Sequence, residues 1–63
     1  MQMITILEIV HSDRPHVLPT LVTRQGSKEE RWAICRERAE LSRPFVGQSL
    51  TPAQFDELLG RWL

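Results

Sequence analysis

The sequence predicts a small α+β domain of the order ββαα, in which an N-terminal β-hairpin is followed by two amphipathic helices. Three observations support this fold class. Residues 3–10 have the period-two apolar pattern of a β-strand, and two amphipathic segments with helix-capping sequences follow. The chain has 63 residues, which is the size of a single domain, 1–63. A chain this short buries only about 60% of its unfolded surface. We therefore expect the sheet to be completed by dimerisation.

Apolar side chains alternate onto both faces of the strand expected at residues 2–10. One face carries Ile4, Ile6 and Val10, and the other carries Met3, Leu7 and Ile9. A strand that is apolar on both faces needs cover on both sides. Two helices are too little to supply it all, so part of the cover is expected from a second copy or from a partner chain.

A second strand is expected within residues 16–24, after a turn that contains Pro15. The segment is rich in β-branched residues. Pro19 lies inside it and has no N–H to donate to a neighbouring strand. This proline therefore marks a bulge or a sheet edge, or it limits the strand to residues 20–24.

The first helix is expected at residues 27–42. Ser27 and Glu30 have the spacing of a capping box, and Pro44 disfavours a helical conformation just before it. The apolar half of this helix would carry Trp32, Ile34, Cys35, Ala39 and Leu41. On that face Cys35 is expected to pack as a small hydrophobic side chain.

The second helix is expected to begin after Thr51, with Pro52 in its first turn and Gln54 completing a second capping box. Its apolar stripe comprises Phe55, Leu58, Leu59 and Trp62, spaced i, i+3, i+4 and i+7. Gly60 costs about 1 kcal/mol inside a helix. The helix is therefore expected to fray or to stop at this glycine.

Composition excludes several classes of function. Eight basic residues balance eight acidic ones, so no global field attracts nucleic acid or an anionic membrane. Cys35 is the one cysteine, which excludes an internal disulfide and fits a reducing compartment. The N-terminus lacks the features of a signal peptide, so a cytoplasmic location is expected. No metal or other cofactor is expected, because the two histidines and Cys35 have no metal-site spacing.

Four residues are candidates for binding a partner: Arg31, Arg38, Phe45 and Trp62. The two arginines lie one heptad apart on the apolar half of the first expected helix, where they could clamp a carboxylate or phosphate. The alternative is that they snorkel at the edge of the core. Phe45 forms either a contact patch or a plug between the helices, and Trp62 is either a hot spot or part of the core.

These features favour a non-enzymatic protein-binding module that forms a homodimer and docks on a larger protein. No residue pattern indicates a catalytic mechanism, and an enclosing pocket would use surface that so small a chain needs for its core. Small neutral proteins of this kind commonly regulate or inhibit larger machines. Inhibitors encoded by phages or mobile elements are one such group.

The alternative is a dimeric DNA-binding repressor. The order strand, helix, helix from residue 20 onward has the outline of ribbon-helix-helix repressors, which lay paired strands in the major groove. Thr20, Val22 and Arg24 would then alternate toward the bases. The strongly apolar strand upstream, the long loop between the helices and the zero net charge all count against this alternative.

Overall fold

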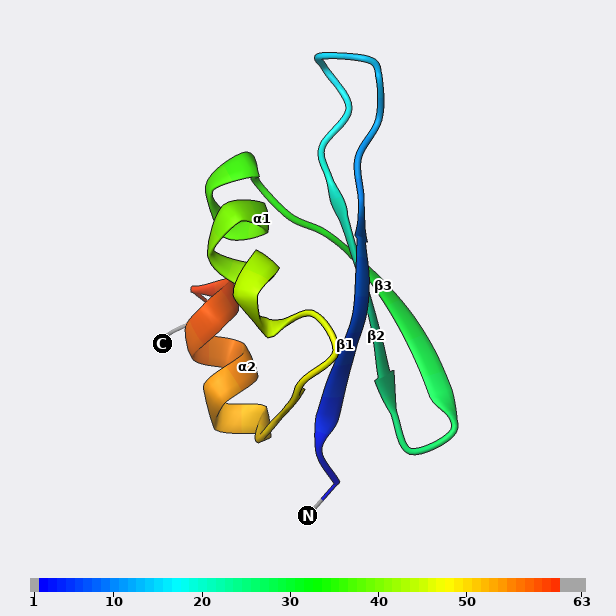
Figure 1. The fold of residues 1–63 in the computed structure, drawn as a ribbon, viewed down its shortest axis with the longest axis vertical. Coiled ribbons are helices and arrows are strands. Elements are labelled where there is room, and N and C mark those ends of the chain that lie inside the picture. Colours follow the sequence, from blue (N-terminus) through cyan, green and yellow to red (C-terminus); the bar gives the residue numbers. More distant parts are fainter. Residues whose placement is uncertain (1, 61–63) are drawn as a thin grey trace.

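Four antiparallel strands form one sheet in the computed structural model, which describes residues 2–60, and two helices pack on that sheet (Figure 1). The elements in chain order are β1 (Ile4–Val10), β2 (Thr20–Gln25), β3 (Lys28–Ala33), α1 (Arg36–Ser42), the 3₁₀ turn η1 (Arg43–Phe45), β4 (Ser49–Leu50) and α2 (Pro52–Leu59). The strand order across the sheet is β3-β2-β1-β4. The α+β class is confirmed, and the ββαα order is replaced by βββαβα.

The helix expected at residues 27–42 is wrong in its first half, because residues 28–33 form β3. Gly26 has φ +63°, and with Ser27 it makes a two-residue turn that joins β2 directly to β3. The six residues of β3 pair in continuous register with β2, from Gln25↔Lys28 to Thr20↔Ala33. Ser27 therefore lies in a hairpin turn, and the capping box expected there does not form. Tertiary pairing has overridden a helix-like local sequence.

A β-bulge in β1 changes which apolar side chains reach the core. Ile6 pairs with Thr23 while Glu8 pairs with the next residue of β2, so Leu7 is the extra residue. The extra residue reverses the alternation, and Ile9 then pairs with Leu21 on the same face as Ile6. The regular alternation expected for this strand is therefore wrong beyond Leu7.

The core lies between the sheet and the helices, which both cover the same face (Figure 1). Its buried members are Ile6, Leu21, Ile34, Ala39, Leu50 and Phe55. β1 is a central strand with β2 on one side and β4 on the other. Within the described residues, the helices of the same chain cover this face. The sheet is therefore completed within one chain and does not need a second copy to reach four strands.

β2 begins at Thr20, in agreement with the shorter strand, residues 20–24, that Pro19 allows. Pro19 precedes it, is buried, and accepts a hydrogen bond through its carbonyl from the Ile34 N–H at 2.9 Å. The chain between β1 and β2 projects beyond the helices as an arm, residues 11–18, all of which are exposed (Figure 1). Pro19 thus precedes the first residue of β2, where its lack of an N–H removes no hydrogen bond from the interior of the strand.

The predicted start and end of the second helix are confirmed. The Thr51 hydroxyl accepts from the Gln54 N–H at 3.2 Å, and the Gln54 side chain accepts from the Thr51 N–H at 3.0 Å. Pro52 occupies the first turn, and the helix ends at Gly60, which has φ +70°. No helix within residues 2–60 is long and apolar enough to cross a membrane.

Candidate functional site: a groove between the two helices

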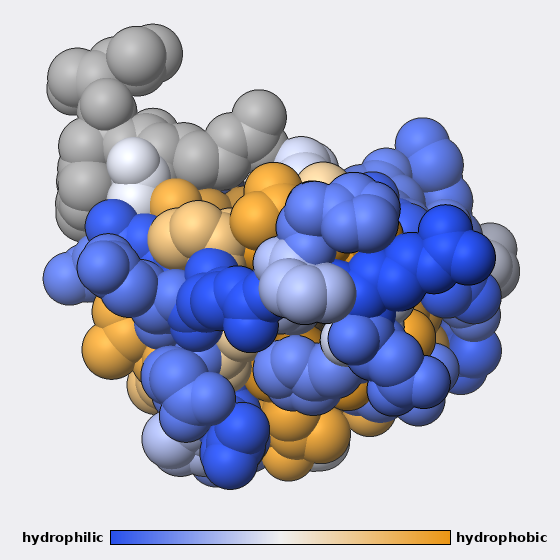
Figure 2. Space-filling model, turned by 90° about the horizontal axis from the view of Figure 1, so that it is seen from above, coloured by the Kyte–Doolittle hydropathy of each residue, from blue (hydrophilic) through white to orange (hydrophobic). Residues whose placement is uncertain are grey.

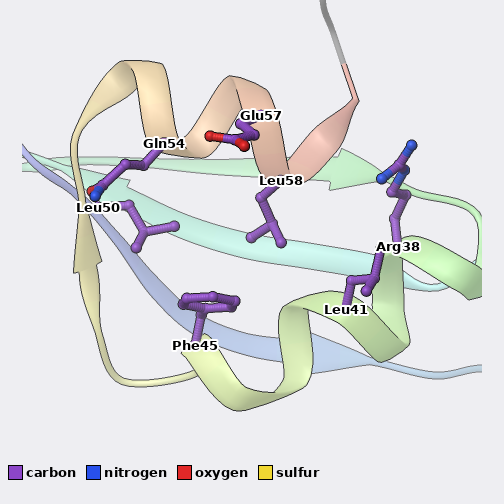
Figure 3. A pocket seen from close by; sticks show the side chains of 7 residues that line it. All are labelled: Arg38, Leu41, Phe45, Leu50, Gln54, Glu57 and Leu58. Carbon is purple, nitrogen blue, oxygen red and sulfur yellow. The ribbon is translucent and has the colours of Figure 1, made fainter.

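A groove of about 420 Å³ lies between α1, η1 and α2 (Figure 3). It is lined by Arg38, Leu41, Phe45, Leu50, Gln54, Glu57 and Leu58. Leu50 from β4 is almost fully buried and forms the floor. The leucine and phenylalanine side chains point toward one another, whereas Arg38 lies at one end (Figure 3).

The walls of the groove expose apolar surface. Leu41 on α1 is 52% exposed. Phe45 on η1 and Leu58 on α2 are each half-buried and pack against that core. Single exposed apolar residues are normal on a protein. Here three of them line one hollow from three elements.

Arg38 is positioned by the C-terminus of α2. The Arg38 guanidinium lies 2.5 Å from the place where a Cβ of residue 60 would stand, so the two groups are in close contact. The cation there faces the negative end of the helix dipole, which favours its position. Among residues 2–60, no carboxylate lies within ion-pair distance of Arg38.

We expect Gly60→Ala and Gly47→Ala to destabilise the protein by similar amounts. Both glycines have positive φ, so both substitutions carry a backbone strain of about 1 kcal/mol. Residue 47 has open space where a Cβ would stand, and at residue 60 the Cβ would meet the end of the Arg38 side chain, which can move aside. Chemical denaturation measures both losses. A much larger loss for Gly60→Ala would mean that the Arg38 side chain is held rigidly against α2.

Arg31 is separated from this groove. It lies on β3, where its register partner is Val22, and it is exposed on the sheet face away from the helices. Its guanidinium lies 3.5 Å from the Glu29 carboxylate, which also lies 3.8 Å from Arg24. The expected placement of Arg31 and Arg38 together on one helix is therefore wrong, because residues 28–33 form a strand.

Two other expected placements concern Trp62 and Cys35. Trp62 lies outside the described residues. Cys35 is exposed, at the N-cap position of α1, where its side chain makes no capping hydrogen bond. It was expected to pack on an apolar helix face, and that expectation is wrong because α1 begins only at Arg36.

The residues of the DNA-binding alternative share one face of β2, as their alternation predicts. Val22 is only 2% exposed, since Glu8 and Arg31 stand opposite it on the two neighbouring strands. β2 is bonded to a strand on each side, and β3 follows it where the alternative needs a helix. Thr20 and Arg24 thus flank a residue that has almost no surface to offer a base.

Seen from the end where the arm projects, the protein is mostly polar, and apolar side chains show as separate patches (Figure 2). No group of three or more His, Cys, Asp or Glu side chains within residues 2–60 is placed to hold a metal ion. The groove between the helices is therefore the candidate site that we develop.

The chain matches no known protein family, no curated protein and no solved structure.

Sequence reasoning found two of the groove residues, Arg38 and Phe45, and missed most of the others. Leu41 was assigned to the core side of a long helix, although the short α1 leaves half of it exposed. Leu58 was identified only as part of an apolar stripe. The pairing of the two helices is a tertiary feature, so the spacing of residues along each helix did not reveal the groove.

Proposed function

We propose that this protein is a small non-enzymatic protein-binding module that regulates or inhibits a larger protein by docking on it through the groove. The observation that carries the proposal is the apolar wall of Leu41, Phe45 and Leu58 beside Arg38, which has no ion-pair partner among residues 2–60. Apolar surface supplies the free energy of association, and a nearby arginine supplies specificity.

The proposed occupant is an amphipathic segment of the larger protein. The groove volume of about 420 Å³ is at the small end for a ligand site, and it is open to solvent. It has room for a few side chains rather than for an enclosed substrate. The segment would place apolar side chains against Leu41 and Leu58 and a carboxylate against Arg38, in a bidentate pair.

A cytoplasmic setting suits this proposal. Cys35 is a free, exposed thiol. An exposed thiol persists in a reducing compartment, whereas oxidising compartments convert such groups to disulfides.

A displayed peptide library tests the proposal. We expect selection on the wild-type protein, with counter-selection on Leu41→Asp, to enrich peptides that carry apolar residues at helical spacing and at least one Asp or Glu. Leu41→Asp should weaken binding of an enriched peptide by about tenfold or more, because it puts a charge into the apolar wall. Arg38→Gln should reduce the preference for acidic peptides.

The matched control is Val46→Asp. This residue is 41% exposed and lies outside the groove, so the same change should leave peptide binding nearly unchanged. Circular dichroism would verify that each variant is folded. Failure to enrich any peptide, or equal binding to Leu41→Asp and the wild type, would refute the groove as the docking surface.

A further inference from the structure

β3 has a free edge. It is the outermost strand in the order β3-β2-β1-β4, and no strand of residues 2–60 pairs with its outer side. An edge of this kind presents unpaired N–H and C=O groups and can add a strand from another chain. Natural edges are often blocked by a proline, a bulge or charged side chains. β3 has no proline and pairs with β2 in unbroken register, and its four charged residues, 28–31, carry both signs.

The hydrogen-bond pattern identifies which residues offer these groups. The Ile34 N–H donates to the Pro19 carbonyl, so the backbone of Ile34 faces β2. Along an antiparallel strand, the N–H and C=O groups of successive residues point alternately to the two neighbouring positions in the sheet. The backbone groups of Glu29, Arg31 and Ala33 therefore point away from β2. The free edge therefore presents the N–H and C=O of these three residues to a neighbouring strand.

The charges on this edge are self-complementary. When two copies of β3 pair antiparallel about a two-fold axis at Glu30, Glu29 of each copy stands opposite Arg31 of the other. Both residues lie on the face away from the helices, and both turn their backbone groups outward. In this register the two Glu29–Arg31 pairs are also backbone hydrogen-bonded pairs of the new antiparallel ladder.

Neighbouring registers are less favourable. An axis at Arg31 sets the two Arg31 side chains opposite each other and forms no Glu–Arg pair. An axis at Glu29 sets Lys28 opposite Glu30 twice and opposes the two Glu29 carboxylates, but it shortens the overlap between the strands. In the favoured register the two Glu30 side chains stand opposite each other. Each Glu30 carboxylate already forms an ion pair with Lys28 of its own chain, at 3.1 Å.

We propose that two copies of this protein pair along β3, antiparallel, with the two-fold axis at Glu30. The interface is isologous, because each copy gives the same strand. It joins two four-stranded sheets into one continuous sheet, and it leaves the groove of each copy open. The proposal does not rest on the proposed function, so either can fail without the other.

Charge reversal tests the pairing. We expect the wild-type protein to sediment at twice the monomer mass at micromolar concentration, and Glu29→Arg and Arg31→Glu each to sediment as monomers. A mixture of the two variants should form heterodimers, because each restores opposite charges to the other. The doubly reversed protein, Glu29→Arg with Arg31→Glu, should again form homodimers.

Glu37→Arg on α1 is the matched control, since it reverses an exposed charge outside β3 and should leave the dimer intact. Circular dichroism checks the folding of each variant. A monomeric wild type, a dimeric single variant or a mixture that stays monomeric would each overturn the proposal.

The register has a separate test in the Cys35→Ser background. Residues that face each other across the axis lie close enough for a disulfide. We expect Glu30→Cys to form an intermolecular disulfide readily and Arg31→Cys to form it poorly. Preferential cross-linking at residue 31 would overturn the axis at Glu30, and this result does not depend on any charge-reversal variant folding.

Discussion

Ile6→Asp is expected to abolish folding. Ile6 is fully buried on the central strand β1, between β2 and β4. A carboxylate there would lose its hydration, which costs on the order of several kcal/mol in a protein interior. A domain of this size has a total stability of only about 3–9 kcal/mol. Circular dichroism should show loss of the native spectrum, and a stably folded variant would contradict the core placement of Ile6.

Val10→Asp is the matched control on the same strand. Regular alternation puts this residue on the face of Ile6, but the bulge at Leu7 separates them, and Val10 is 42% exposed. We therefore expect Val10→Asp to remain folded, with a change in stability within about 0.5 kcal/mol. Unfolding by both substitutions would argue against the bulged register.

Phe55→Ala is expected to lower the free energy of unfolding by about 3–5 kcal/mol. Phe55 is 2% exposed, and its ring meets Trp32 edge to face with 5.6 Å between centroids. The substitution removes that contact and leaves a cavity between α2 and the sheet. Urea denaturation followed by circular dichroism measures the loss.

Leu18→Ala is the comparison for Phe55→Ala. Leu18 lies on the arm and is 52% exposed, so its truncation should change the stability by less than about 0.5 kcal/mol. Similar losses from the two substitutions would mean that Phe55 does not anchor α2 to the sheet.

The second helix could be predicted from sequence because its determinants are local. Thr51, Pro52 and Gln54 specify its start through hydrogen bonds within one turn, and Gly60 specifies its end through backbone conformation. These effects do not depend on the rest of the fold. The break at Pro19 has a local cause as well, but a bulge, a sheet edge and a strand that starts at residue 20 were all consistent with it.

β3 could not be recognised by the same reasoning, because charged residues at 28–31 suit a helix as well as a strand. The pairing with β2 makes this segment a strand, and the sequence of residues 28–33 alone carries no sign of that pairing. Two features do point to a strand. The turn at Gly26 suits a hairpin, and the Lys28–Glu30 and Glu29–Arg31 ion pairs have the i, i+2 spacing that places neighbours on one face of a strand.

The bulge at Leu7 and the groove are tertiary features in the same sense. Nothing in the composition of residues 4–10 marks which residue is extra, because the apolar run continues through it. The prediction that Arg38 and Phe45 are binding residues was based on helix geometry, yet the groove that holds both depends on how α2 packs on β4 and α1.

Docking at the groove is tested most directly by mapping the site of one enriched peptide with amide chemical shifts. We expect the largest shifts on α1, η1 and α2, close to Leu41 and Phe45, and small shifts on β3. Arg38→Gln should reduce the shifts caused by an acidic peptide. Shifts that are largest on β3 or on the arm would contradict docking at the groove.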